Sequence, residues 1–146
     1  MSHKINILTR TSGRPNGFSI CAKSVTGQTY KNVNHIVCYD DDNDLEYINE
    51  VADVNKIKID RDEVIKNDTS INPNNPSFWF SPHNLYCNEL LDAVEDGYIL
   101  FLDDDDMLLD ETVIEEIVGN IVDEDTMLVW QMRYPDGRVL PNRNHF

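Results

Sequence analysis

The chain has 146 residues, of which 40% are hydrophobic, and 27 acidic against 12 basic side chains give it a formal net charge of −15. This length fits a single domain over residues 1–146, and no apolar run reaches the roughly 20 residues that a membrane-spanning helix needs. Such an acidic chain is a poor match for a polyanion held through its phosphates, so we expect neither a nucleic-acid nor a membrane partner. The N-terminus passes straight into a strand pattern with no signal-type segment, which predicts a cytoplasmic location.

Two strand–helix units open the chain. Alternating apolar residues predict a strand over 4–9, and apolar residues at helical spacing predict a helix over 15–26, with a proline in its first turn. A second strand is expected over 35–39, followed by a helix with Asp42 or Asn43 as its N-cap. The first turn carries no glycine-rich phosphate-binding motif, so any bound phosphate must be held by side chains and metal.

A third strand is predicted over 54–59, and a long irregular stretch follows over 66–81. Loops of this length in compact domains are often functional. The aromatic residues 78–80 within it are expected either to pack onto the core or to line a ligand site. A Ser-Pro pair at 81–82 then signals the start of a further helix, which Asp96-Gly97 ends.

The central feature is residues 98–106, where five apolar residues run directly into four aspartates. The apolar run predicts a strand covered on both faces, as in a parallel sheet between helices. If the chain stays extended, Asp103 and Asp105 point one way and Asp104 and Asp106 the other. Clustered carboxylates suit Mg²⁺ or Mn²⁺. The ordinary alternative is a solvated loop that caps the next helix.

The last third of the chain is expected to hold a helix capped by Asp110, a fifth strand over 127–132 and a turn over 134–138 that returns the chain as a short hairpin through Val139 and Leu140. Three cysteines lie far apart in apolar patterns and have no metal-binding spacing, so we expect buried thiols. The whole pattern predicts a Rossmann-like α/β/α sandwich with a mainly parallel central sheet. Such a sheet would gather the carboxyl ends of the first, second and fourth strands at one edge.

Four blocks of this sequence resemble a known family. They are Ile5 to Thr9 with Arg14-Pro15, then Gln28-Thr29-Tyr30, the run Val37-Cys38-Tyr39-Asp40-Asp41, and Gly97 to Asp106 with Asn88 before it. Together, in this order and spacing, they resemble the nucleotide-binding half of GT-A type glycosyltransferases, and family 2 among them. The resemblance implies a minimal nucleotide-sugar-binding domain of GT-A type.

The resemblance also implies roles at the edge of the sheet. Thr9 and Arg10 would contact the nucleotide. Asp41, or its neighbour Asp40, would accept a hydrogen bond from the uracil N–H of a UDP-sugar. Arg61, after the third strand, would touch the base or a phosphate, unless it only pairs with a neighbouring acid.

The metal site of the family would map onto the four aspartates. Asp103-Asp104-Asp105 would be the DXD motif, in which Asp103 and Asp104 contact the nucleotide. Asp103 would face the ribose or a metal-bound water, and Asp105 would ligate the Mn²⁺ or Mg²⁺ that bridges the diphosphate. GT-A enzymes often add a histidine near the C-terminus, and His145 is the candidate for that ligand.

The chain departs from the family after the DXD motif, where the region that carries the acceptor site and the general base is missing or much shortened. Asp136 is the candidate base, with Asp123, Glu124 and Asp125 as alternatives, although each fits an ordinary turn or surface acid as well. Such a reduced domain could complete its site by forming a homodimer.

The expected function is therefore metal-dependent transfer of a sugar from a nucleoside diphosphate, UDP being favoured, to an unknown acceptor hydroxyl. One alternative is a catalytically idle nucleotide- or metal-binding module that needs a partner for the acceptor site. A second is a phosphatase of the haloacid dehalogenase type, whose DxD motif follows the first strand rather than the fourth.

Overall fold

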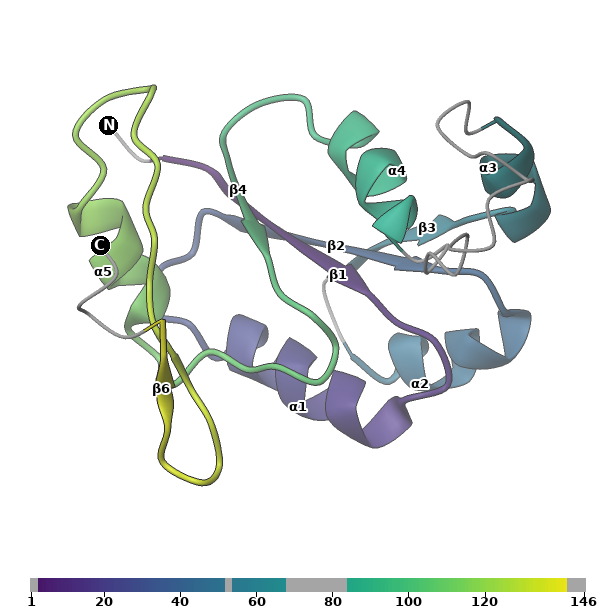
Figure 1. The fold of residues 1–146 in the computed structure, drawn as a ribbon, viewed down its shortest axis with the longest axis horizontal. Coiled ribbons are helices and arrows are strands. Elements are labelled where there is room, and N and C mark those ends of the chain that lie inside the picture. The colour runs from purple at the N-terminus through teal and green to yellow at the C-terminus, as the bar shows by residue number, and fades with distance from the viewer. Residues whose placement is uncertain (1–2, 52–53, 68–83, 142–146) are drawn as a thin grey trace.

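The computed structural model describes residues 3–51, 54–67 and 84–141 (Figure 1). Its elements in chain order are β1 (Ile5–Arg10), α1 (Pro15–Thr26), β2 (Val33–Tyr39), the 3₁₀ turn η1 (Asp42–Asp44), α2 (Leu45–Asn49), β3 (Val54–Lys58), α3 (Arg61–Asn67), α4 (Tyr86–Asp92), β4 (Tyr98–Phe101), α5 (Val113–Gly119), β5 (Met132–Arg133) and β6 (Val139–Leu140). The aromatic residues 78–80 lie outside the described residues. In the part of the chain that is described, no helix has the length and apolar character to cross a membrane.

The four longer strands form one parallel sheet in the order β3-β2-β1-β4. Ile5 of β1 lies opposite Val33 of β2 on one side and Tyr98 of β4 on the other. All four strands therefore point the same way, and their carboxyl ends meet at one edge of the sheet. This confirms the predicted α/β class with a mainly parallel sheet.

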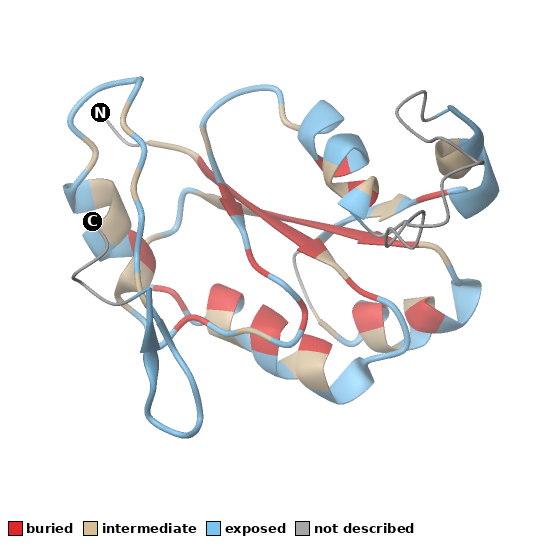
Figure 2. Ribbon diagram, viewed as in Figure 1, coloured by how far each residue is buried: buried red, intermediate tan, exposed pale blue. Residues whose placement is uncertain are grey.

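Helices cover both faces of the sheet (Figure 1). On one face, buried residues of α1, α2 and α5 pack against the strands, among them Phe18, Ile48 and Ile114. On the other face, Leu90 of α4 packs in a second cluster with Leu8 of β1. Figure 2 shows the buried residues concentrated in the central strands and on the inner sides of these helices. The result is the predicted three-layer sandwich.

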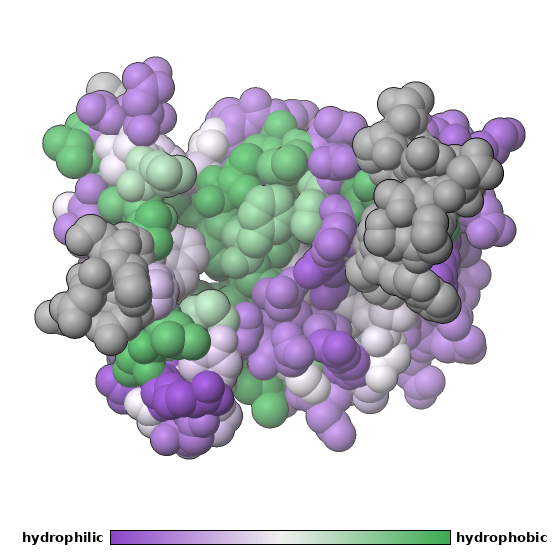
Figure 3. Space-filling model, in the orientation of Figure 1, coloured by the Kyte–Doolittle hydropathy of each residue, from purple (hydrophilic) through white to green (hydrophobic). Residues whose placement is uncertain are grey.

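The prediction that the strand before the aspartates is covered on both faces is wrong. Ile99 and Phe101 of β4 are 43% and 47% exposed, while Leu100 between them is buried. The reason is that α4 lies over β1 and β2 rather than over β4. Figure 3 shows the apolar surface that this leaves in the middle of the face.

The predicted fifth strand over 127–132 is also wrong, although the hairpin is confirmed. Met132 alone of that run belongs to a strand, and Met127 and Val129 are exposed. β5 pairs antiparallel with β6 in a separate two-stranded ribbon. The local turn provides the pairing partner, since Gly137 donates its backbone N–H to Tyr134 O at 2.9 Å, and the run does not join the main sheet.

Two helix starts differ from the prediction. Asp41, not Asp42 or Asn43, is the cap after β2, because its carboxylate accepts the backbone N–H of Asn43 at 2.9 Å. The helix α3 was not predicted, since it buries no residue and so has no apolar stripe. Its start is marked by Asp60, whose carboxylate accepts two backbone N–H groups of the first turn.

Candidate functional site

Two arginines stand at the carboxyl end of β1 and in the loop that follows it. Arg10 is the last residue of β1, and Arg14 is the N-cap of α1, placed there by Pro15 at the first helical position. The loop between them is fixed by a buried carboxylate, because Asp44 accepts the backbone N–H of Gly13 at 3.0 Å. Gly13 has φ of +63°, which a glycine adopts without strain. The loop therefore presents both arginines from a defined backbone.

The four aspartates after β4 form a turn, which we call the acidic turn (residues 103–106). The backbone N–H of Asp106 donates to the carbonyl of Asp103 at 3.0 Å, so the chain folds back immediately after the strand ends. The expectation of an extended run, with Asp103 and Asp105 on one face and Asp104 and Asp106 on the other, is therefore wrong. Within a turn the side chains follow the turn geometry instead of a two-residue period.

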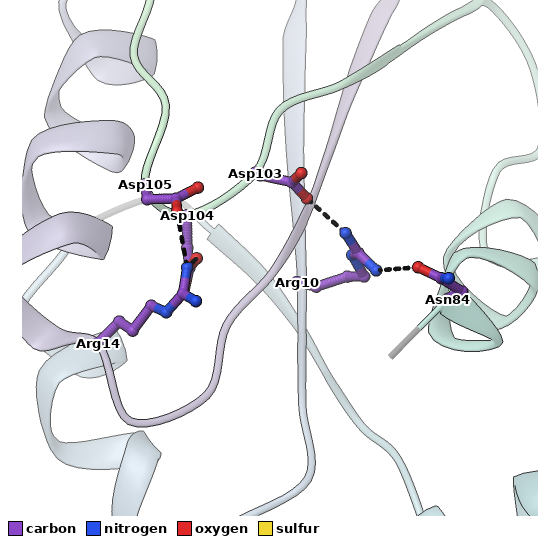
Figure 4. Close-up of polar contacts among 6 residues, drawn as sticks. All are labelled: Arg10, Arg14, Asn84, Asp103, Asp104 and Asp105. Carbon is purple, nitrogen blue, oxygen red and sulfur yellow. Dashed lines mark hydrogen bonds and ion pairs between the residues drawn. The ribbon is translucent and has the colours of Figure 1, made fainter. Parts of the chain in front are cut away.

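The arginines hold the acidic turn through three ion pairs (Figure 4). Arg10 Nη2 donates to Asp103 Oδ1 at 2.7 Å, and its Nη1 donates to Asn84 Oδ1 at 3.1 Å. Arg14 Nη1 lies 3.2 Å from Asp104 Oδ1 and 2.8 Å from Asp105 Oδ2. Asp103 therefore has one arginine, whereas Asp104 and Asp105 share the other.

The carboxylates of the acidic turn differ in burial. Asp104 is buried, and burial raises its pKa above the usual value, while a hydrogen bond to Thr11 and the charge of Arg14 oppose that rise. Burial also raises the pKa of Asp106, with help from the charges of Asp105 and Asp103. In turn, the charges of Asp104 and Asp105 raise the pKa of Arg14. Negative charge is thus concentrated in the acidic turn, and it holds the positively charged guanidinium of Arg14.

These side chains surround a concave site of about 390 Å³. Its lining comes from the β1–α1 loop, from the start of α4 and from the acidic turn, and comprises Arg10, Thr11, Ser12, Arg14, Asn84, Tyr86, Asp103, Asp104 and Asp105. We call this hollow the arginine–aspartate cavity. It lies where ligands bind in open α/β sheets, beyond the carboxyl ends of the strands.

Asp40 and Asp41 follow β2 but face different partners. Asp40 Oδ2 accepts a hydrogen bond from the hydroxyl of Tyr86 at 2.7 Å, and Tyr86 lines the cavity. Asp41 caps the 3₁₀ turn, as described above. Arg61, the exposed first residue of α3, acts electrostatically on the Tyr86 hydroxyl. The structure thus brings Asp40 and Arg61 toward the cavity through Tyr86.

Thr9 does not line the cavity. It is fully buried, and its hydroxyl lies 2.9 Å from Nε2 of His35 in the neighbouring strand. Thr11, two residues further along the chain, does line the cavity, and its hydroxyl lies 2.9 Å from that of Tyr47. The difference is that Thr9 lies within β1, where the neighbouring strand covers its side chain, whereas Thr11 follows the end of the strand and belongs to the loop that lines the cavity.

The candidate base Asp136 is not among the described residues that line the cavity. Asp136 lies in the β5–β6 hairpin, where its carboxylate pairs with Arg138 at 2.6 Å. In Figure 1 this hairpin lies beyond the C-terminal end of α1, whereas Arg14 is at the N-terminal end. Asp123 accepts a hydrogen bond from Thr126 and is likewise not part of the lining. His145 lies outside the described residues.

A second and larger hollow of about 530 Å³ lies at the carboxyl end of β3, between α3 and α4. Among the described residues, its charged lining includes Asp60, Glu63 and Glu89 but only one basic residue, Lys58, which is paired with Asp42. An anionic ligand finds more positive charge in the arginine–aspartate cavity. We therefore take the smaller hollow as the candidate site.

The residue types of the cavity fit a hard divalent ion in part. Asp103 and Asp105 are more than half exposed and offer oxygen ligands of the kind that Mg²⁺ and Mn²⁺ prefer. Within the described residues, no group of three or more His, Cys, Asp or Glu side chains is placed to hold an ion. Two carboxylates would suffice for Mg²⁺ if phosphate oxygens and waters filled its other positions.

Several lining residues were not assigned a role from sequence. Arg14 is part of a recognised block, but its spacing of four residues from Arg10 pointed to no particular partner. Asn84 and Tyr86 start a helix far from the aspartates in sequence, and nothing in their pattern sets them apart. Only the packing of α4 over β1 and β2 brings them to the cavity.

Comparisons with known proteins support the fold alone. No protein-family model matches the chain, and no curated protein sequence matches it. Among solved structures, a crystal structure of S. aureus TarS 1–349 superposes with a TM-score of 0.56 at 15% identity, covering 80% of this chain and 31% of that one. A second crystal structure of S. aureus TarS gives a TM-score of 0.51 at 14% identity, with 80% and 19% covered. The chain thus spans less than a third of either, and its fold is similar to that of a glycosyltransferase.

Proposed function

We propose that this chain is the nucleotide-sugar-binding domain of a metal-dependent glycosyltransferase. It would move a sugar from a nucleoside diphosphate donor, with UDP favoured, to an acceptor hydroxyl. The observation that carries the proposal is the arginine–aspartate cavity, in which two arginines and three carboxylates meet beyond the carboxyl ends of β1 and β4. The likeness to TarS, a glycosyltransferase, supports the same choice and favours it over a phosphatase.

Groups in and beside the cavity would serve each part of a nucleoside diphosphate. Arg10 and Arg14 supply guanidinium groups, which match the geometry of phosphate oxygens. Asp40, aligned by Tyr86, would accept the N–H of the base. Asp103 would face the ribose or a metal-bound water. Arg61 would contribute positive charge near the base. Thr9 would support the site from within the core through His35 rather than by direct contact.

Asp103 and Asp105 would hold the Mn²⁺ or Mg²⁺ together with oxygens of the diphosphate. A divalent ion in this place would neutralise the charge that builds on the departing diphosphate. Buried Asp104 would hold the turn and contribute to nucleotide binding indirectly, since its carboxylate is engaged by Arg14. His145 stays a predicted further ligand.

One observation favours a second candidate function, a nucleotide-binding module that depends on a partner for the acceptor site. No acid outside the acidic turn lines the cavity within the described residues, so no separate general base is in place there. Asp136 stays a predicted base that no observation tests. A product assay with a labelled donor separates transfer from binding alone.

The expected homodimer also stays a prediction. β4 pairs with β1 alone among the described strands, and Ile99 and Phe101 are exposed on one face of it. An open edge with apolar neighbours can pair with a further strand. Light scattering at several protein concentrations measures the oligomeric state, and a monomer at every concentration would contradict the expected homodimer.

The proposal is tested by thermal shift with UDP, GDP and CDP, each with and without Mn²⁺, because a ligand of the folded state alone raises stability. We expect one nucleotide, UDP, to stabilise the protein when Mn²⁺ is present. Asp105→Ala should abolish the metal-dependent part. Equal stabilisation of the Asp105→Ala variant, or no shift with any pair, would argue against a donor site.

A further inference from the structure

Arg14 holds the acidic turn in an unusual way. A single nitrogen, Nη1, contacts both Asp104 Oδ1 and Asp105 Oδ2, at 3.2 and 2.8 Å (Figure 4). The two carboxylates are not equivalent, since the Asp104 side chain is 7% exposed and that of Asp105 is 63% exposed. Arg14 thus binds one fixed acid and one accessible acid at the same time.

The same oxygens are the ones a divalent ion would need. A cation ligated by Asp105 would compete with the Arg14 guanidinium for Oδ2, and the two positive charges would repel each other. The guanidinium can leave, because the Arg14 side chain is itself 57% exposed and its described hydrogen bonds go to these two aspartates. The backbone would stay in place, since Gly13 is held by Asp44 and Pro15 starts α1.

Arg10 differs from Arg14 in each respect. Its side chain is only 23% exposed, and it is tied to Asn84 as well as to Asp103. It stands at the end of β1, where the sheet restrains its backbone. Arg10 is therefore suited to remain where it is when a ligand enters.

We propose that Arg14 is an exchangeable counter-ion: it neutralises Asp104 and Asp105 until a divalent ion takes Asp105, and it then turns to the diphosphate of the nucleotide. This rests on the proposed function, because it requires that the cavity accept a metal ion and a nucleoside diphosphate. The exchange couples the binding of the metal ion to the binding of the nucleoside diphosphate. A metal ion alone must displace Arg14, whereas a metal ion that arrives with a diphosphate finds Arg14 a new partner.

The consequence is opposite effects of one substitution on two ligands. In Arg14→Met, Mn²⁺ alone should bind about two- to fivefold more tightly, since it no longer displaces an exposed ion pair. UDP at saturating Mn²⁺ should bind about tenfold more weakly, since a charged hydrogen bond to the diphosphate is lost. The coupling between the two ligands, measured as the change in Mn²⁺ affinity on adding UDP, should fall accordingly.

The experiment measures free Mn²⁺ by electron paramagnetic resonance, with and without UDP, and UDP binding by calorimetry at saturating Mn²⁺. Arg138→Met is the matched control, because it removes the same charge from an exposed ion pair in the hairpin. It should leave both affinities unchanged. Arg14→Lys keeps the charge but lacks the planar fork, so its Mn²⁺ affinity should lie between those of the wild type and Arg14→Met.

The outcomes separate this inference from the proposed function. Failure of the wild type to bind UDP with Mn²⁺ would overturn the proposed function and the diphosphate half of the exchange with it. If the wild type binds both ligands, unchanged or weaker Mn²⁺ binding by Arg14→Met would overturn the exchange and leave the donor site standing. Unchanged UDP affinity of Arg14→Met would also overturn the exchange and leave the donor site standing. If Arg14→Lys binds Mn²⁺ with the same affinity as the wild type, the effect of Arg14 on Mn²⁺ affinity would come from long-range charge repulsion alone. Direct competition for the Asp105 oxygen would then be overturned.

Discussion

A Cβ atom on Gly17 would lie 2.9 Å from the backbone carbonyl oxygen of Asp104. Real Cβ atoms do not approach backbone oxygens so closely, and the neighbour is main chain rather than a flexible side chain. The first turn of α1 therefore reaches the acidic turn only because residue 17 is glycine. Arg14 lies three residues before Gly17, and Asp104 and Asp105 lie on the other side of this contact. The close approach of Gly17 to Asp104 therefore helps to set the distance between Arg14 and these two aspartates.

The first prediction follows from that contact. Gly17→Ala should push the acidic turn away from α1 and weaken UDP binding in the presence of Mn²⁺ by about tenfold or more, because misplaced ligands lose most of a charged contact. Its effect on folding stability should be small, because the strain is offset by the roughly 1 kcal/mol that alanine gains over glycine in a helix. Calorimetry and urea unfolding measure the two effects.

Gly119→Ala is the matched control for this prediction. Gly119 ends α5, and a Cβ there meets nothing within 4 Å. This variant should leave UDP affinity unchanged and raise stability by up to about 1 kcal/mol. Wild-type UDP affinity in Gly17→Ala would show that the close approach has no part in positioning the site.

The second prediction distinguishes the two aspartates after β2. Asp40→Asn should lower UDP affinity about tenfold, because the carboxylate aligned by Tyr86 would no longer accept the N–H of the base. Asp41→Asn should change neither affinity nor stability, since asparagine caps a helical turn as well as aspartate does. Both variants are compared by calorimetry with UDP and Mn²⁺. A larger loss in Asp41→Asn would reassign the base contact to Asp41.

The third prediction concerns acid stability. Burial lowers the pKa of His35 to about 4, from an ordinary value of 6.5. Between these values the unfolded chain binds the proton and the folded chain does not, so the free energy of unfolding falls as pH falls from 6.5 to 4. Above about pH 6.5 this contribution is fully present, and its loss at low pH amounts to about 3 kcal/mol.

The test compares wild type with His35→Gln by urea unfolding at pH 4.5, 5.5 and 7. The glutamine side chain can still reach the Thr9 hydroxyl but does not titrate, so the difference between the two proteins isolates His35 from the raised carboxyl pKa values of the acidic turn. We expect the variant to lose less stability on acidification. Parallel curves would mean that His35 titrates alike in the folded and unfolded chain.

The fourth prediction concerns the thiols. Cys21 and Cys38 are fully buried, and burial raises the pKa of each to about 12, whereas Cys87 is partly accessible. A thiol-reactive reagent at neutral pH should therefore modify Cys87 first, because it attacks an accessible thiolate. The two core thiols should react only at the rate of unfolding. Mass spectrometry after limited labelling identifies the site, and rapid modification of Cys21 would contradict the buried arrangement.

The sequence predicted the frame of this protein well. The alternation of 4–9 and the apolar run of 35–39 predicted β1 and β2, and the helical spacing after Pro15 predicted α1. The apolar run of β2 and the helical stripe of α1 are buried as their patterns indicate, whereas β1 is buried on both faces although its pattern alternates. Parallel strands with right-handed connections then bring their carboxyl ends together, so the location of the candidate site could be inferred before its geometry.

Short or one-sided elements were predicted less well. The helix α3 has no fully buried residue and left no clear apolar stripe, although Asp60 followed by Glu63 at capping-box spacing could have indicated it. The run before the aspartates looked like a fully covered strand, yet Ile99 and Phe101 are exposed. Apolar composition does not say whether a neighbouring helix is present to cover a face.

By itself, then, the sequence determined the parallel strands of the main sheet, the helix α1 and the gathering of acids at one edge, because periodicity and chain direction are local properties. Only the tertiary structure decided which acid meets which partner. Arg14 reaches Asp105 across 91 positions of sequence, and Tyr86 reaches Asp40 across 46. Such pairs depend on how loops and helices pack over the sheet, and the single hydrogen bond from Asp106 to Asp103 was enough to turn an expected extended run into a bend.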